Sequence, residues 1–98
     1  MLYDVIVVGS GISGLYAALY AKRAGLHVAL VCKSNPLRSN SAVASGGINA
    51  VLKSTPHDSV RDHVADTLNG SDKLGRLSAI TAMTSGAEEI IEELRGMG

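Results

Sequence analysis

A glycine-rich turn between an apolar run and a helical pattern constrains this chain more than any other feature. The apolar run covers residues 2–8 and is rich in β-branched side chains, which is typical of a strand buried in a parallel sheet. Gly9, Gly11 and Gly14 follow with the spacing GxGxxG, and residues 15–21 carry the small and apolar side chains of a packed helix. Strand, glycine turn and helix in this order predict a βαβ unit that binds a dinucleotide.

Each glycine of the turn has its own expected role. Gly9 lets the chain turn sharply off the strand, and Gly11 lacks the Cβ that would hold a pyrophosphate away from the backbone. Gly14 lets the helix pack closely on the strand. A pyrophosphate would then lie on the free N–H groups at the helix N-terminus, where the helix dipole favours negative charge.

The residues after the helix complete the unit. Gly25 follows Lys22 and Arg23, two cations suited to the C-terminal end of a helix, and it predicts the helix stop. Residues 27–32 form a second apolar run, so strand, turn, helix and strand fit within about 30 residues, as the motif requires. The expected fold class is therefore α/β.

The end of the second run bears on the choice of dinucleotide. An Asp or Glu at this position would bind an adenosine ribose, but the chain has Cys32, Lys33 and Ser34 here and no acid. A lysine suits the 2′-phosphate of NADP, and it can equally face the ribose or pyrophosphate of FAD. These residues alone leave both dinucleotides open.

The segment that follows resembles a known flavoprotein loop. Residues 38–50 read RSNSAVASGGINA, which is similar to the flavin-contacting loop of the succinate dehydrogenase, fumarate reductase and L-aspartate oxidase flavoproteins. That family combines an Arg-Ser-His-Thr or Gly-Ser-Thr lead with a few small residues and Gln-Gly-Gly-Ile. Residues 63–67 (HVADT) and 70–72 (GSD) resemble two further motifs of the family, and the likeness runs along essentially all 98 residues.

The resemblance implies FAD as the cofactor and a Rossmann-like βαβ FAD-binding unit followed by helices. It implies that the glycine turn contacts the pyrophosphate, that Lys33 lies at the adenosine end, and that residues 40–47 follow the ribityl chain and the isoalloxazine. Small side chains predominate in residues 41–48, so the backbone can lie against a flat ring and its N–H groups can tune the flavin. The expected cofactor-binding residues are Gly9, Ser10, Gly11, Ile12, Ser13, Gly14, Lys33, Ser39, Asn40, Ser41, Ala42, Val43, Ala44, Ser45, Gly46 and Gly47.

Two residues of the loop depart from the family pattern. Members in membrane complexes have a histidine at the position of Asn40, and that histidine bonds covalently to the flavin. Because an asparagine cannot form this bond, Asn40 predicts FAD that is held without a covalent link. Ser45 stands where Gln or Glu is usual, so one polar contact near the flavin is expected to differ.

Composition excludes several classes of partner. Nine basic and nine acidic residues cancel, so no electrostatic footprint for nucleic acid or an anionic membrane is present. No apolar run approaches the length of about 20 residues that a membrane span needs, and the first residues lack a signal-peptide pattern. Cys32 is the single cysteine and is expected to be an inert buried thiol. These features favour a reducing compartment, the cytoplasm.

The second half of the sequence predicts two helices that serve as scaffold. The first covers residues 58–68, with Asp58 or Ser59 as N-cap. The second covers residues 77–95, with Gly96 as its stop. Their expected buried faces are Val60, Val64 and Leu68, and Leu77, Ile80, Ala87, Ile90, Ile91 and Leu94. The charged residues His57, Asp62, His63, Asp66, Glu88, Glu89, Glu92 and Glu93 are interpreted as solvated faces, not as a metal site or a catalytic pair.

The number of strands shapes the functional hypothesis. Two strands are predicted, or three if residues 47–52 are extended, whereas a doubly wound nucleotide domain has five or six. Residues 1–98 are therefore expected to be the incomplete N-terminal part of one FAD-binding domain, inactive without the remainder of the flavoprotein or a separate subunit. The implied reaction is FAD-dependent oxidation or reduction of a C4 dicarboxylate, fumarate or succinate. L-aspartate oxidase, which forms iminoaspartate, and a non-catalytic nucleotide-binding or assembly module stay open as alternatives.

Overall fold

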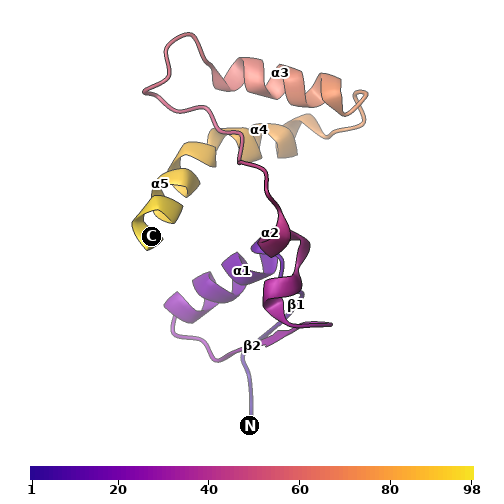
Figure 1. Ribbon diagram of the computed structural model, residues 1–98, viewed down its shortest axis with the longest axis vertical. Coiled ribbons are helices and arrows are strands. Elements are labelled where there is room, and N and C mark those ends of the chain that lie inside the picture. Colours follow the sequence, from indigo (N-terminus) through magenta and orange to yellow (C-terminus); the bar gives the residue numbers. More distant parts are fainter. The chain divides into compact units, whose positions relative to one another are not determined.

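The computed structural model describes all residues from Met1 to Gly98, and they form two compact units, residues 1–46 and 47–98 (Figure 1). The first unit contains β1 (Val5–Val8), α1 (Ile12–Arg23), β2 (Val28–Val31), the 3-10 helix η1 (Pro36–Arg38) and α2 (Asn40–Val43). The second unit contains α3 (Val60–Gly70), α4 (Leu77–Ser85) and α5 (Ala87–Met97).

The first unit has the predicted strand–turn–helix–strand order. β1 and β2 pair in parallel along their whole length, with Val5 opposite Val28 and Val8 opposite Val31, and α1 makes the crossover between them (Figure 1). The Gly9 N–H extends the ladder by donating to the Val31 carbonyl at 2.8 Å. Both strands are shorter than the apolar runs 2–8 and 27–32 that predicted them. Only residues 5–8 and 28–31 have a partner on the other strand.

Gly25 ends α1 as expected. Its φ of +83° lies in the left-handed region that favours glycine. The Gly25 N–H donates to the Lys22 carbonyl at 3.0 Å and the Leu26 N–H to the Ala21 carbonyl at 3.1 Å. These two bonds are those of a Schellman motif, which satisfies carbonyls that the helix leaves without partners.

The two-stranded sheet is covered on one face within its own unit. Val5 and Val7 are half-buried, and the Val7 Cγ1 atom lies 3.4 Å from the position that a Cβ on Gly14 would take, so this face packs on α1. The alternate residues Ile6 and Val8 are 64% and 83% exposed, and Val31 beside them on β2 is 51% exposed. Successive residues of a strand point to opposite faces, so these three form one uncovered apolar face.

The α3 helix begins at an N-cap serine. The Ser59 Oγ accepts a hydrogen bond from the Asp62 N–H at 3.1 Å, and the Ser59 hydroxyl donates to the Asp62 carboxylate at 2.7 Å. Of the two predicted caps, Ser59 is the one that acts, and the predicted face of Val60, Val64 and Leu68 is half-buried. The Asp62 carboxylate, at the third helical position, therefore interacts both with the Ser59 hydroxyl and with the positive end of the helix dipole.

The prediction of a single helix over residues 77–95 is wrong. The chain forms α4 and α5, with Gly86 between them at φ −88° and ψ −5°, where an α-helix has ψ near −42°. Glycine is less favourable than alanine inside a helix by about 1 kcal/mol. A break at Gly86 therefore loses less helix stability than a break at a neighbouring residue would. The predicted stop at Gly96 is also wrong, because Gly96 keeps a negative φ and α5 continues to Met97.

The break changes which side chains of these helices are buried. Ile80 is 7% exposed, and Ala87, Ile91 and Leu94 are half-buried as predicted. Leu77 and Ile90, which were predicted to be buried, are exposed instead.

The core of the second unit lies under α4. Thr84 is 2% exposed, and its hydroxyl donates to the Ile80 carbonyl at 2.9 Å. Gly75 lets the preceding turn approach Ile80, since a Cβ there would stand 2.6 Å from the Ile80 Cδ1 atom. Residues 47–52 form no strand, so the only sheet in residues 1–98 has two strands. None of the helices has the length and apolar character needed to cross a membrane.

Candidate functional site

The three glycines of the turn differ in what the fold requires of them. Gly9 has a φ of +111°, a conformation that other residues rarely adopt. A Cβ on Gly14 would overlap the Gly9 carbonyl oxygen and approach the Val7 Cγ1 atom to 3.4 Å. A Cβ on Gly11, in contrast, would meet only the Ser41 Oγ atom, at an ordinary contact distance of 3.5 Å. The fold therefore needs Gly9 and Gly14, whereas the glycine at position 11 leaves space that the chain itself does not use.

The N-terminus of α1 offers donors to that space. Gly11 is the N-cap and provides no side chain, and the first turn of any helix has N–H groups without carbonyl partners. The Ile12 N–H donates to the Ser41 Oγ atom at 3.0 Å, and no hydrogen bond within the chain satisfies the N–H groups of Ser13 and Gly14. Donors in this arrangement, at the positive end of a helix dipole, suit a phosphate group.

A cavity of about 350 Å³ lies beside this helix end, entirely within the first unit. Three segments line it: the turn at residues 9–11, the end of β2 at residues 32–34, and residues 38–41. Two of its ten lining residues, Lys33 and Arg38, are cationic and none is acidic. The charge and the helix N-terminus together favour an anionic ligand.

Local capping holds residues 38–41 against the cavity. The Asn35 side chain accepts from the Leu37 N–H at 3.0 Å and starts η1, and the Ser39 Oγ accepts from the Ala42 N–H at 3.2 Å and starts α2. The Ser41 hydroxyl then joins α2 to the first residue of α1. The segment that resembles a flavin-contacting loop thus begins with one helical turn, fixed to the glycine turn by a side chain.

The structure brings together seven of the residues that the sequence proposed for the cofactor. They are Gly9, Ser10, Gly11, Lys33, Ser39, Asn40 and Ser41. Ile12, Ser13 and Gly14 form the first turn of α1 next to the cavity, and Ala42, Val43, Ala44, Ser45 and Gly46 follow the lining segment along the chain. Gly47 belongs to the second unit. Their individual contacts with a cofactor stay predictions.

Sequence reasoning missed three residues of the cavity wall, Cys32, Ser34 and Arg38. The signal for the first two was their position on either side of Lys33, at the strand end that commonly faces a ribose. The signal for Arg38 was its place at the start of the motif RSNS, since a positive charge there precedes the small residues directly.

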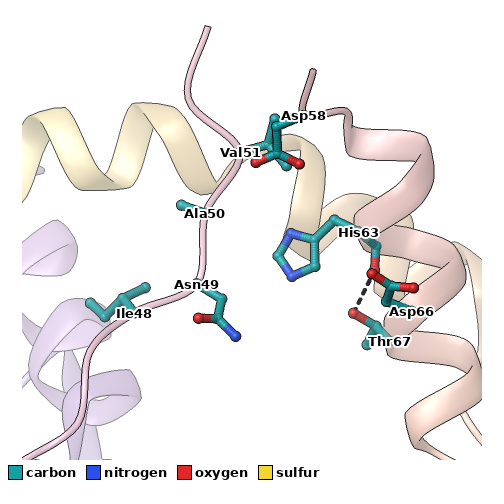
Figure 2. Close-up of a pocket in the computed structure, with 8 residues that line it drawn as sticks. All are labelled: Ile48, Asn49, Ala50, Val51, Asp58, His63, Asp66 and Thr67. Carbon is teal, nitrogen blue, oxygen red and sulfur yellow. Dashed lines mark hydrogen bonds between the residues drawn. The ribbon is translucent and has the colours of Figure 1, made fainter. Parts of the chain in front are cut away.

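The second unit has a more polar cavity of about 520 Å³. Figure 2 shows the side chains of His63, on α3, and Asn49 pointing into the space between α3 and residues 48–51. The Thr67 hydroxyl donates to the His63 carbonyl at 2.7 Å, which fixes Thr67 on the same wall. Asp66 is exposed, as expected for a solvated face, whereas His63 is half-buried. No group of three His, Cys, Asp or Glu side chains in residues 1–98 is arranged to hold a metal ion.

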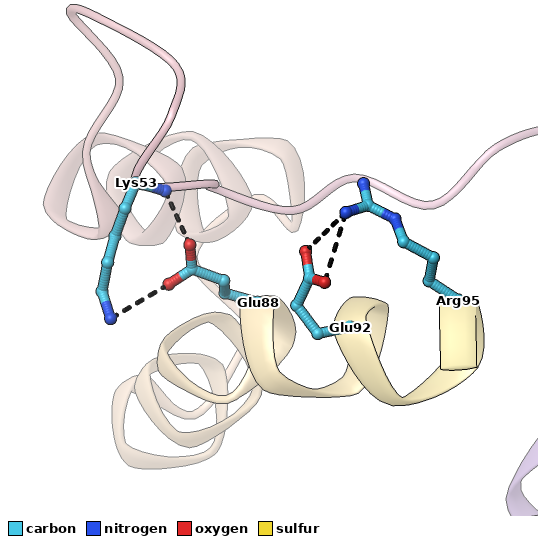
Figure 3. Close-up of polar contacts among 4 residues, drawn as sticks. All are labelled: Lys53, Glu88, Glu92 and Arg95. Atoms are coloured by element: carbon cyan, nitrogen blue, oxygen red, sulfur yellow. Dashed lines mark hydrogen bonds and ion pairs between the residues drawn. The ribbon is translucent and has the colours of Figure 1, made fainter. Parts of the chain in front are cut away.

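The glutamates of α5 stabilise the second unit. The Glu88 carboxylate accepts from the Lys53 backbone N–H at 2.8 Å and lies 3.5 Å from its Nζ atom, while Glu92 pairs with Arg95 at 3.1 Å (Figure 3). Glu88 is half-buried, contrary to the prediction of a wholly solvated face, because it tethers the segment before α3 to the start of α5. Ion pairs as exposed as these contribute about 0–1 kcal/mol each.

The parallel β1–α1–β2 unit, with its glycine turn and its cationic cavity, defines a dinucleotide-binding protein. The particular family is that of the FAD binding domain, whose match extends over residues 4–98, and the chain belongs to it. This match names FAD and so resolves the choice between FAD and NADP that Lys33 left open.

Individual relatives agree with this family. The chain is 44% identical over 96 residues to the succinate dehydrogenase flavoprotein subunit of Rickettsia bellii, covering 98% of this chain and 16% of that protein. It is 36% identical to L-aspartate oxidase, chloroplastic, of Oryza sativa subsp. japonica, with 98% and 14% covered. A solved structure, a point mutant of E. coli quinol fumarate reductase FrdA, matches with a TM-score of 0.87 and 33% identity, over 95% of this chain and 16% of that one. The chain thus spans only a small part, 14% to 16%, of the length of these relatives.

Proposed function

We propose that residues 1–98 hold FAD in a flavoprotein oxidoreductase that interconverts fumarate and succinate. The observation that carries this proposal is the cavity beside α1, where Gly11 leaves room that the fold does not need and no acid opposes a phosphate. The family match to an FAD binding domain and the similarity to succinate dehydrogenase and fumarate reductase proteins support it.

The residues have distinct roles in this proposal. The N–H groups from Ser10 to Gly14 bind the pyrophosphate at the N-terminus of α1, and Lys33 lies at the adenosine end. Residues 40–47 follow the ribityl chain and the isoalloxazine, with backbone N–H groups that donate to the ring. The bound flavin supplies hydride transfer at its N5 atom, so this chain orients the cofactor and contributes electrostatics. None of its residues is assigned a catalytic role.

We propose further that the FAD is held without a covalent bond. Asn40 stands at the first position of α2 and lines the cavity, and its amide is not a nucleophile that could attach to the flavin. Affinity must then come from the phosphate contacts and from the ordered α2 segment.

L-aspartate oxidation is the second candidate. Asn40 favours it because a dissociable flavin is a feature of the L-aspartate oxidase pattern, and one relative carries that name at 36% identity. A nucleotide-binding or assembly module without catalysis is the candidate from another class. The proposed partners are a dicarboxylate substrate and either the remainder of the flavoprotein or a separate subunit. Assays on the complete protein distinguish the three candidate functions.

The test compares the wild-type protein, expressed from its complete reading frame, with Gly11→Ala and Gly96→Ala. The methyl group at position 11 enters the cavity at a tolerated 3.5 Å from Ser41, so FAD affinity should fall while the fold persists. Position 96 has no atom within 4 Å of an added methyl, so the control should bind FAD like the wild type. Equal FAD affinity of all three proteins would refute the assignment of the cavity.

Substrate assays on the FAD-loaded wild type then separate the candidates. Dye reduction with succinate supports the proposal, oxidation of L-aspartate supports the second candidate, and FAD binding without either activity supports the module. We also propose the cytoplasm as the compartment, since a single half-buried cysteine suits a reducing environment. Cell fractionation followed by detection of the protein tests this location.

A further inference from the structure

We infer that Cys32 makes the cofactor cavity sensitive to thiol modification, so that a modified Cys32 and bound FAD exclude each other. The inference rests on the proposed function of the cavity and adds a mode of regulation to it. Cys32 is the residue directly after β2 and lines the cavity together with the glycine turn and Lys33. Cys32 is half-buried, not buried as predicted, and its thiol is free.

A second residue shows independently that this cavity is shaped for a ligand. Ser10 is only 8% exposed and lines the same cavity, yet its hydroxyl forms no hydrogen bond within residues 1–98. Because no group of the chain occupies it, the Ser10 hydroxyl is available to a ligand that enters the cavity. Ser10 and Cys32 therefore line the space that a bound dinucleotide fills.

The positive charge of the cavity favours anionic thiol reagents over neutral or cationic ones. Lys33 and Arg38 line the cavity and no carboxylate does, so an anionic reagent is attracted to it. A small anionic disulfide such as oxidised glutathione fits this description. The Cys32 thiolate attacks one sulfur of the disulfide and forms a mixed disulfide, and the other half leaves as a thiolate that takes up a proton. Cys32 is oxidised in this step and the small disulfide is reduced.

The added group and the cofactor compete for one volume. A glutathionyl group on Cys32 would extend into the cavity of about 350 Å³ that the cofactor uses in the proposed function. Modification thus keeps the apoprotein free of cofactor, and reduction of the mixed disulfide restores binding. Bound FAD, in turn, shields the thiol.

The test uses the protein from its complete reading frame, with and without FAD, and the variant Cys32→Ser. N-ethylmaleimide and oxidised glutathione are the probes, and mass spectrometry of the peptide that contains residue 32 measures modification. We expect label at Cys32 in the apoprotein, little label in the FAD-loaded protein, and loss of FAD binding after labelling. Dithiothreitol should restore binding to the glutathione-treated protein only. Cys32→Ser is the labelling control: treatment should leave the FAD affinity of this variant, whatever its value, unchanged, which shows that other cysteines are not responsible.

The possible failures are distinguishable. If the untreated wild type fails to bind FAD, the proposed function is wrong. If it binds FAD, but the labelled wild type binds it equally well or FAD does not slow labelling, the proposed function stands and this inference is wrong.

Discussion

Replacing Gly14 by alanine should destabilise the β1–α1 packing while leaving α5 unaffected. The new Cβ would overlap the Gly9 carbonyl oxygen and stand 3.0 Å from the Gly9 carbonyl carbon, and both atoms are backbone that cannot rotate away. Overpacking of this kind costs about 1–3 kcal/mol, and two backbone contacts place this case at the upper end. Alanine recovers about 1 kcal/mol of helix propensity, so the expected net loss is about 2 kcal/mol.

Hydrogen–deuterium exchange measured by mass spectrometry reports this loss locally. A change of about 2 kcal/mol in the opening free energy speeds exchange about 30-fold, and we expect this in the peptides that cover residues 5–23. Gly96→Ala is the matched control, because the same methyl group meets no atom within 4 Å there and should slow exchange in α5. Wild-type exchange rates in residues 5–23 of Gly14→Ala would show that the helix does not pack on the turn as described.

Three further outcomes are expected. Ser59→Ala removes the cap of α3 and its bond to Asp62, so exchange in residues 60–66 should become about fivefold faster, for a loss of about 1 kcal/mol; an unchanged rate would mean that the cap does not stabilise the helix. Acid precipitation of the FAD-loaded protein should release all flavin to the supernatant because of Asn40, and flavin fluorescence on the precipitated polypeptide would contradict this. Residues 1–98 produced alone should aggregate, because they expose 7653 Å², whereas even two separate compact bodies of half the mass would expose about 6,400 Å² in total. A monomer with a cooperative thermal transition would contradict that expectation.

The first unit could be predicted from the sequence because its signals are local. The GxGxxG spacing, the apolar runs on either side and Gly25 each act within a few residues, and each has one conformational meaning. The contact between Ser41 and Ile12 could not be predicted this way. It joins residues 29 positions apart, and no periodicity specifies which of several serines will reach a helix end.

The second unit shows where glycine signals become ambiguous. Gly86 and Gly96 both lie in a strongly helical pattern, and the sequence does not reveal which of them interrupts it. The C′ glycine that commonly ends a helix adopts a positive φ, and whether Gly96 does so depends on the residues that follow. The half-buried position of Glu88 depends likewise on tertiary contact with Lys53, which composition cannot indicate.

The uncovered face formed by Ile6, Val8 and Val31 has a consequence for the synthesis of the protein. All three residues are present once the ribosome has made the first 31 positions, and the helix that covers the opposite face lies between them in the chain. At about 5–20 residues per second, any segment that covers this face arrives seconds later. The nascent chain therefore exposes an apolar strand surface of the kind that chaperones bind. We expect a chaperone to bind this face before the flavin does.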